Sequence, residues 1–289
     1  MQWANAVVQG VILGGLYALL AAGLSLMFGV MRLVNLAHGA LAIVAAYMGM
    51  VLVNKTGIPP FATLLIVVPV MALVGWILQR TLLNTALKRQ ALAPILVTFG
   101  LAVILQNLML ELFTADNQSI DVGSLAGASI QITPDIAVGV FPLMTFVVGV
   151  LVIAGLQLYL AKTTTGRAMR ATSDDREAAQ LMGIDHRNIY ALATAIAVGL
   201  VGLAGVFLGV RTQFNPTFGD VTLIFAFEAV IIGGLGSLWG TLWGGIILGV
   251  AQVVGAQAFP SSGVLLGHIV FLLVLAFRPT GLFPKVVNG

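Results

Sequence analysis

One carboxylate lies where it could do chemistry away from bulk water. Glu228 is the one acidic residue of the apolar run 224–231. A charged side chain at bilayer depth is costly unless it is paired or hydrated, so such a residue marks a functional site by default. Two interpretations are open. Glu228 faces a translocation path and meets the amino group of a solute, or it is a hydrogen-bonded residue that pins a broken helix to its neighbour.

Three further polar side chains lie in or beside apolar runs. Asn35 and His38 are one helical turn apart where the second run begins. They either line the cytoplasmic mouth of a path or cap and tie helix ends. His268 is alone in its apolar run, where core hydrogen bonding is the expected role. With three scattered histidines and no cysteine, we expect no metal site.

Catalytic signatures are absent from the sequence. We find no recognisable set of nucleophile and base, and no metal constellation, so an enzyme is not predicted. The G-x-x-x-x-G-K-[S/T] phosphate loop is missing too. We therefore expect no cofactor on this chain, and any ATP and Mg²⁺ used by it would be bound by partner subunits.

A glycine-rich stretch interrupts one apolar run. Gly233, Gly234 and Gly236 lie close together there, and broken helices often line the cavities of transporters. These three are therefore candidate pathway residues. Glycine recurs every fourth residue from Gly236 through Gly240 to Gly244, a spacing that favours close helix contact. Tight packing is the default interpretation, and a flexible gate is the alternative.

The elements that position these residues are expected to be transmembrane helices. Of 289 residues, 60% are hydrophobic and 8% charged, against roughly 25% charged in soluble domains. Long unbroken apolar runs do not fit the alternating pattern of a β-barrel. We predict an all-α integral membrane protein, a bundle of eight to nine transmembrane helices in one domain, 1–289. The expected spans are 7–30, 34–53, 61–80, 92–113, 137–160, 190–210, 221–236, 240–256 and 263–278. The seventh and eighth are alternatively one interrupted unit or a re-entrant pair.

Basic residues predict the orientation, because they are enriched in cytoplasmic loops. With nine crossings and an extracytoplasmic N-terminus, the opposite side holds only Lys55 and Arg211. The C-terminus is then cytoplasmic. The cytoplasmic residues are Arg32, Arg80, Lys88, Arg89, Lys162, Arg167, Arg170, Arg176, Arg187, Arg278 and Lys285.

Two loops are long enough to carry a function. The outer one, about 114–135, contains Asp116, Asp121 and Asp135, and its segment 129–133 alternates like a short strand. It is either a solvated connector or a docking surface for an external partner. The inner one, about 162–190, holds most of the charge of the chain.

The second half of the inner loop predicts a short helix over 174–183. Asp174 can cap its N-terminus, and Glu177 three residues later gives the spacing of a capping box. Gly183 suits the left-handed position after the last turn, and Asp185 can cap the next span.

One face of this predicted helix is apolar. Ala178, Leu181 and Met182 follow the i, i+3, i+4 pattern. The face therefore packs on its own bundle or fills a groove on a soluble partner.

Glu177-Ala178-Ala179 followed by Gly183 resembles the EAA…G loop of ABC importer permeases. The rest of the chain is similar to the branched-chain amino-acid (LivH-type) permeases. The segments that carry this resemblance are 14–19, 34–40, 166–171, 232–240 and 278–283.

The resemblance implies a permease subunit of an ATP-driven importer in the bacterial inner membrane. Its partners would be a second, related permease, two ABC ATPase subunits and a periplasmic binding protein that delivers hydrophobic or branched-chain amino acids; no nucleic acid is expected. The coupling residues would be Asp174, Glu177, Ala178, Ala179, Leu181, Met182 and Gly183.

Two alternatives are open. Urea, an amide or an aromatic acid would be a different substrate for the same kind of importer. An ion-coupled secondary transporter or channel would be a different class, but it would be expected to carry more intramembrane charge. Only Glu228 lies well inside a predicted span, which argues against that class.

Overall fold

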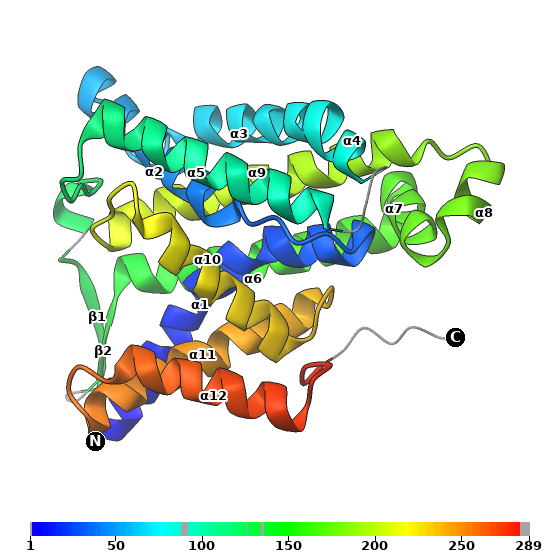
Figure 1. Ribbon diagram of the computed structural model, residues 1–289. Helices are drawn as coiled ribbons and strands as arrows, with labels where there is room; N and C mark the ends of the chain where they lie inside the picture. Colours follow the sequence, from blue (N-terminus) through cyan, green and yellow to red (C-terminus); the bar gives the residue numbers. More distant parts are fainter. Residues whose placement is uncertain (1, 88–91, 126, 134–135, 284–289) are drawn as a thin grey trace. The chain divides into compact units, whose positions relative to one another are not determined.

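The computed structural model describes residues 2–87, 92–125, 127–133 and 136–283, and most of them are helical (Figure 1). The helices are α1 (Gln2–Met31), α2 (His38–Thr56), α3 (Leu64–Leu78), the π-helical η1 (Gln79–Leu83), α4 (Asn84–Ala86), α5 (Ala93–Phe113), the 3₁₀ turn η2 (Gly123–Leu125), α6 (Val140–Lys162), α7 (Thr164–Asp174), α8 (Arg176–Leu181), α9 (His186–Arg211), α10 (Phe218–Gly233), α11 (Leu238–Ala258) and α12 (Gly263–Phe277). Lys88, Arg89, Asp135 and Lys285, which carried part of the orientation and loop predictions, lie outside the described residues.

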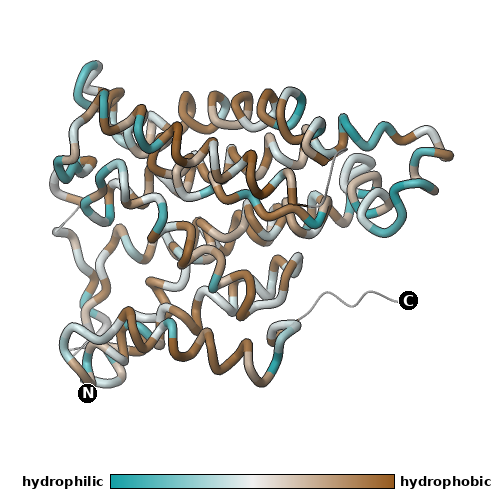
Figure 2. The backbone as a smooth tube through the Cα atoms, viewed as in Figure 1, coloured by the Kyte–Doolittle hydropathy of each residue, from teal (hydrophilic) through white to brown (hydrophobic). Residues whose placement is uncertain are grey.

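Seven helical segments in the described ranges are long and apolar enough to cross a bilayer. They are α1, α2, the continuous stretch 60–86, α5, α6, α9 and α11, and α12 is a shorter apolar helix. Figure 2 shows the apolar character running along these helices, whereas the backbone through α7 and α8 is largely hydrophilic. The predicted all-α membrane class is confirmed at this level. The seventh predicted span ends earlier than expected, at Gly233.

The chain divides into two compact units. Unit 1 contains Met1–Ser25, Asp121–Ala154 and Ile224–Gly289, and unit 2 contains Leu26–Ile120 and Gly155–Leu223. Three helices, α1, α6 and α10, each contribute residues to both units.

Unit 2 is built around α9, which packs on α2 and α3. Small residues allow this approach: a Cβ added at Gly205 would lie 2.2 Å from the carbonyl oxygen of Ala42. At the π-helical turn, the hydroxyl of Thr194 donates to Oε1 of Gln79 at 2.7 Å, and both side chains are fully buried. This hydrogen bond satisfies two polar groups in an apolar interior, where an unpaired group would be costly.

Unit 1 joins α1 to α11 and α11 to α12. A Cβ at Gly14 would lie 2.4 Å from the Cα of Ile246, and one at Gly249 would lie 2.4 Å from the carbonyl oxygen of Gly10. Figure 1 shows α11 and α12 side by side, and Leu266 of α12 packs over Gly255 of α11. Close helix contact through small residues is therefore how this unit is held together.

The outer loop is ordered by backbone pairing at both of its ends. Within unit 2, Gln118 and Phe214 exchange backbone hydrogen bonds of 2.8 and 2.9 Å. Within unit 1, β1 (Ser129–Thr133) pairs antiparallel with β2 (Ile136–Gly139). Nε2 of Gln9 donates to the carbonyl of Ala137 at 2.7 Å and fastens this hairpin to α1. The strand expected over 129–133 is confirmed.

Candidate functional site

The polar segment after α6 folds into two short helices rather than one. Thr163 caps α7 with its hydroxyl, which accepts a hydrogen bond from the backbone N–H of Gly166 at 2.9 Å. Met169 and Thr172 are buried on the inner face of α7. At the end of α7 the hydroxyl of Ser173 donates to the carbonyl of Gly29 at 2.7 Å. This bond ties α7 to the last turn of α1 inside unit 2.

The N-cap of α8 is Asp175, so the assignment of that role to Asp174 is wrong. Asp175 is in an extended conformation, and its Oδ1 accepts from the N–H groups of Glu177 at 2.9 Å and Ala178 at 3.0 Å. Asp174 is the last residue of α7. The predicted helix over 174–183 is accordingly shorter, Arg176–Leu181, and Glu177 is one residue too close to the cap for a capping box.

The C-terminal end of α8 and the start of α9 follow the sequence prediction. Gly183 has φ +82°, a left-handed conformation that favours glycine. The N–H of Ile184 donates to the carbonyl of Ala179 at 3.0 Å, which closes the turn. Oδ1 of Asp185 then accepts from the N–H of Arg187 at 2.9 Å and caps α9. Both predictions are confirmed.

No described residue covers the apolar face of α8. Leu181 and Met182 are 89% and 82% exposed, and Ala178 is exposed beside them. Ala179 alone is buried. The described residues therefore do not show this face packed on its own bundle, and its contact with a soluble partner stays a prediction.

His186, which sequence reasoning did not single out, connects α8 to α9. Its Nε2 lies 2.9 Å from Nη2 of Arg176, and the side chain of Gln180 contacts the other ring nitrogen. The ring also packs edge-on against Tyr190 of α9, with centroids 5.7 Å apart. These contacts join α8 to the first turns of α9.

Glu228 and His268, treated as separate residues from the sequence, form a pair between α10 and α12. Oε1 of Glu228 lies 2.5 Å from Nδ1 of His268. Glu228 is 4% exposed, and its Oε2 has no hydrogen-bond partner among the described residues. His268 makes a hydrogen bond as expected, but its side chain is 36% exposed and is not part of the buried core. For Glu228, the geometry matches the helix-pinning interpretation.

A second polar pair in unit 1 was not expected. The hydroxyl of Tyr17 on α1 donates to Oε1 of Gln252 on α11 at 2.5 Å. The ring of Phe225 lies between the two pairs, 5.1 Å from the ring of Tyr17 and 6.2 Å from that of His268, centroid to centroid. Four helices thus bring polar groups together around one aromatic ring. The sequence signal was the isolation of Gln252 and Tyr17 in apolar runs.

Asn35 and His38 lie at the start of α2, and both are buried. Oδ1 of Asn35 accepts from the N–H of Ala37 at 3.0 Å, and its carbonyl accepts from the N–H of His38 at 3.2 Å. Asn35 is therefore seen tying a helix end, which is one of its two expected roles. Whether either residue meets a solute stays a prediction.

The glycine stretch separates α10 from α11 and receives the C-terminal segment. Gly234 and Gly236 have φ +108° and +79°. A Cβ at Gly281 would lie 2.4 Å from the Cα of Gly234. The N–H groups of Leu282 and Phe283 donate to the carbonyls of Ile232 and Gly233, each at 2.9 Å. Two sequence segments far apart in the chain therefore form one structure, which closes the C-terminal end of α10.

Residues 6–277 match the protein family described as branched-chain amino acid transport system, permease component. This chain belongs to that family. The resemblance found in the sequence is confirmed, and membership supports a permease over an ion-coupled transporter or channel.

The chain is also similar to individual proteins that are named as permeases of this family. The permease is 30% identical to the high-affinity branched-chain amino acid transport system permease protein BraD of Pseudomonas aeruginosa, over 96% of this chain and 94% of that protein. It is 32% identical to the probable branched-chain amino acid transport permease protein LivH of Methanocaldococcus jannaschii, over 92% of this chain and 86% of that protein. The structure of PsaBC from Streptococcus pneumoniae in complex with Fab has a similar fold, with a TM-score of 0.50 at 15% identity over 94% of this chain and 91% of that one.

Proposed function

We propose that this permease is the membrane-spanning subunit of an ATP-driven importer for branched-chain amino acids. The observation that carries the proposal is the family match over almost the whole chain. The exposed apolar face of α8 supports it, because a subunit without a phosphate loop needs a surface through which ATP-driven work arrives. ATP and Mg²⁺ are bound by the partner ATPases.

In this proposal α8 is the coupling helix. Leu181 and Met182 fill an apolar groove on an ATPase subunit, and closure of the ATPases moves α8 as a rigid body. The bonds of His186 pass this movement to α9, and the bond from Ser173 to Gly29 passes it to the end of α1. Substrate translocation then follows from helix movement rather than from chemistry on this chain.

The proposed topology has nine crossings, with the N-terminus outside and the C-terminus in the cytoplasm. Besides the seven long segments, α10 and α12 are counted as crossings. Their 16 and 15 residues correspond to about 24 and 22 Å of helix at 1.5 Å per residue. This arrangement keeps α7, α8 and Arg278 on the cytoplasmic side, in agreement with the preference of basic residues for that side.

The remaining partners are a second, different permease and a periplasmic binding protein. The β1–β2 hairpin, fastened to α1 by Gln9, supports a docking role for the outer loop. Asn35, His38, Glu228, Gly233, Gly234 and Gly236 are proposed pathway residues. For Glu228 a structural role has the better support, since its carboxylate is already bonded to His268.

The deciding experiment is co-purification combined with uptake. The tagged permease, expressed with its neighbouring genes, is purified as wild type, as Leu181→Arg and as Thr164→Arg, a control that adds the same charge to an exposed position on α7. We expect Leu181→Arg to lose the ATPase and the uptake of labelled leucine, isoleucine and valine, and the control to keep both. Absence of an ATPase with the wild type would contradict the importer. Uptake competed by urea, an amide or an aromatic acid, and not by leucine, would overturn the substrate class alone.

A further inference from the structure

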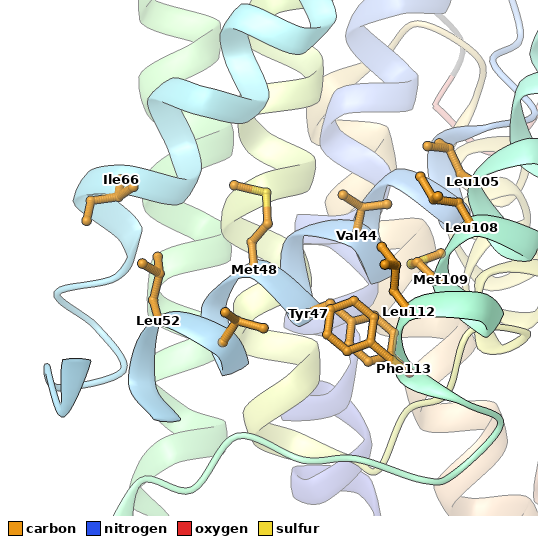
Figure 3. A pocket seen from close by; sticks show the side chains of 11 residues that line it. Val44, Tyr47, Met48, Leu52, Ile66, Leu105, Leu108, Met109, Leu112 and Phe113 are labelled. Carbon is orange, nitrogen blue, oxygen red and sulfur yellow. The ribbon is translucent and has the colours of Figure 1, made fainter. Parts of the chain in front are cut away.

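An apolar groove lies in unit 2 between α2, α3 and α5 (Figure 3). Its volume is about 420 Å³, within the roughly 300–1,000 Å³ typical of ligand pockets. Its longest walls come from α2 and α5. The side chains that form these walls include Val44, Met48, Leu52, Leu105, Leu108 and Leu112.

Exposed apolar side chains border the groove. Leu108 and Leu112 are 52% and 64% exposed, and Ile66 of α3 is 44% exposed. In a bilayer such side chains face hydrocarbon, so the material that enters the groove there is apolar. An unfilled groove would leave its walls without packing partners.

The groove is a poor site for the proposed substrate. Tyr47 is the one lining residue with a polar group, and its ring is stacked on Phe113 with centroids 4.2 Å apart. An amino acid carries an ammonium and a carboxylate, and moving these into apolar surroundings without partners costs several kcal/mol each. A solute with an apolar body and its charge at one end fits better.

The dimensions of the groove match one leaflet. From Val44 to Leu52 the α2 wall is about 12 Å long at 1.5 Å per residue, and half of the hydrocarbon core is about 15 Å. Val44, Met48, Leu52 and Lys55 follow one another at helical spacing along α2. Lys55 therefore continues the same face one turn beyond the groove, at the C-terminal end of the helix.

Lys55 supplies a charge at the level where a lipid headgroup would lie. It is exposed, and no ion pair of Lys55 occurs within the described residues. A lysine near the membrane surface attracts anionic lipids. An apolar groove that spans most of one leaflet and is followed by an exposed cation is complementary to one acyl chain of an anionic phospholipid whose phosphate is at Lys55.

We propose that this groove is a specific binding site for an anionic phospholipid from the leaflet on the side of Lys55. One acyl chain lies between α2 and α5, and the phosphate contacts the ammonium of Lys55. No residue that lines the groove belongs to α8 or to the Glu228–His268 pair, so the proposal does not depend on the substrate.

The first test is photo-cross-linking in the assembled importer. Benzoylphenylalanine replaces Leu112 in the groove, or Ile104, which is 64% exposed on the same helix but does not line it. After exhaustive detergent exchange we expect a phospholipid adduct at position 112 and none at 104. Met48→Trp, which fills the groove, should abolish the adduct, and Leu105→Phe is the second filling variant if the first does not assemble. An adduct to a protein subunit, or no adduct at 112, would overturn the proposal.

The second test addresses the headgroup. Binding of phosphatidylglycerol and of phosphatidylcholine to the purified importer is measured by native mass spectrometry. We expect Lys55→Gln to reduce the preference for phosphatidylglycerol by about fivefold. Lys162→Gln, which removes the same charge at the end of α6, should leave it unchanged. An unchanged preference in Lys55→Gln, or an equal loss in the control, would show that Lys55 does not hold the phosphate.

Discussion

The α7–α8 segment and the α10–α11 junction are held together by opposite means. In α7–α8 the bonds are made by polar side chains, the caps Thr163 and Asp175 and the link through His186, and the apolar side chains of α8 point outward. At the α10–α11 junction glycine backbones touch, and backbone N–H groups of the C-terminal segment close the helix end. Surface side chains of α7–α8 can be replaced without opening a core. At the α10–α11 junction there is no space for a larger side chain.

The sharpest way to test this contrast is to add one methyl group at Gly244. An added Cβ would lie 2.0 Å from the carbonyl oxygen of Ala229, so backbone would have to move. Gly244→Ala should lower stability by about 1–3 kcal/mol or more, measured as a fall in Tm of the purified permease. Gly100→Ala on α5, where nothing lies within 4 Å, is the control and should be neutral or stabilising. Equal Tm values for the two variants would contradict tight packing at the junction.

The Glu228–His268 pair tests whether polar groups in unit 1 are structural. Glu228→Ala removes a buried carboxylate and its hydrogen bond to the partly exposed His268, and should destabilise the permease by about 1–3 kcal/mol. Glu228→Gln retains an acceptor for His268 and should cost less, with uptake preserved. If Glu228→Gln abolishes uptake at unchanged Tm, the carboxylate contacts the solute and the structural interpretation is wrong.

A smaller effect is expected in the polar segment at the cap of α8. Asp175→Ala should cost about 1 kcal/mol of local helix stability. Binding of the ATPase, measured by titration in detergent, should weaken by about fivefold while the Tm of the membrane body stays constant. Asp174→Ala is the matched control, since Asp174 ends α7 and caps nothing. A greater loss with Asp174→Ala would restore the cap predicted from the sequence.

The smallest effect is expected from Ser173→Ala. It removes one hydrogen bond to Gly29, worth about 0.5–1.5 kcal/mol. If this bond transmits movement from α7 to α1, ATPase subunits should still bind while the ratio of solute imported to ATP hydrolysed falls. Thr164→Ala, an exposed change at the other end of α7, should leave that ratio unaltered. An unchanged ratio in Ser173→Ala would mean that movement passes through α9 alone.

Local chemistry explains which features the sequence could predict. Gly183 and Asp185 were placed correctly because a left-handed turn and a cap depend on neighbouring residues only. The cap of α8 was misplaced because two adjacent aspartates offer the same chemistry. The choice between them depends on where α7 stops. Helix α7 itself was missed, although Thr163 was an available cap signal.

Contacts between residues far apart in the chain could not be predicted from a single sequence. Glu228 was found because a carboxylate is conspicuous in an apolar run, but its partner lies on a different helix, and helix packing decides which histidine reaches it. The bond between Gln79 and Thr194 and the link through His186 were missed for the same reason. The glycine stretch and the 278–283 segment were both noticed, yet nothing in their residues showed that they would meet.

The contact between the glycine stretch and the 278–283 segment has a consequence for the synthesis of the protein. The carbonyls of Ile232 and Gly233 receive their donors from Leu282 and Phe283, which leave the ribosome long after α10 has been synthesised. Until then the end of α10 is an incomplete structure, and unit 1 is not finished. A nascent chain released before residue 281 would lack both donors, so the C-terminal end of α10 is completed only when Leu282 and Phe283 have been synthesised.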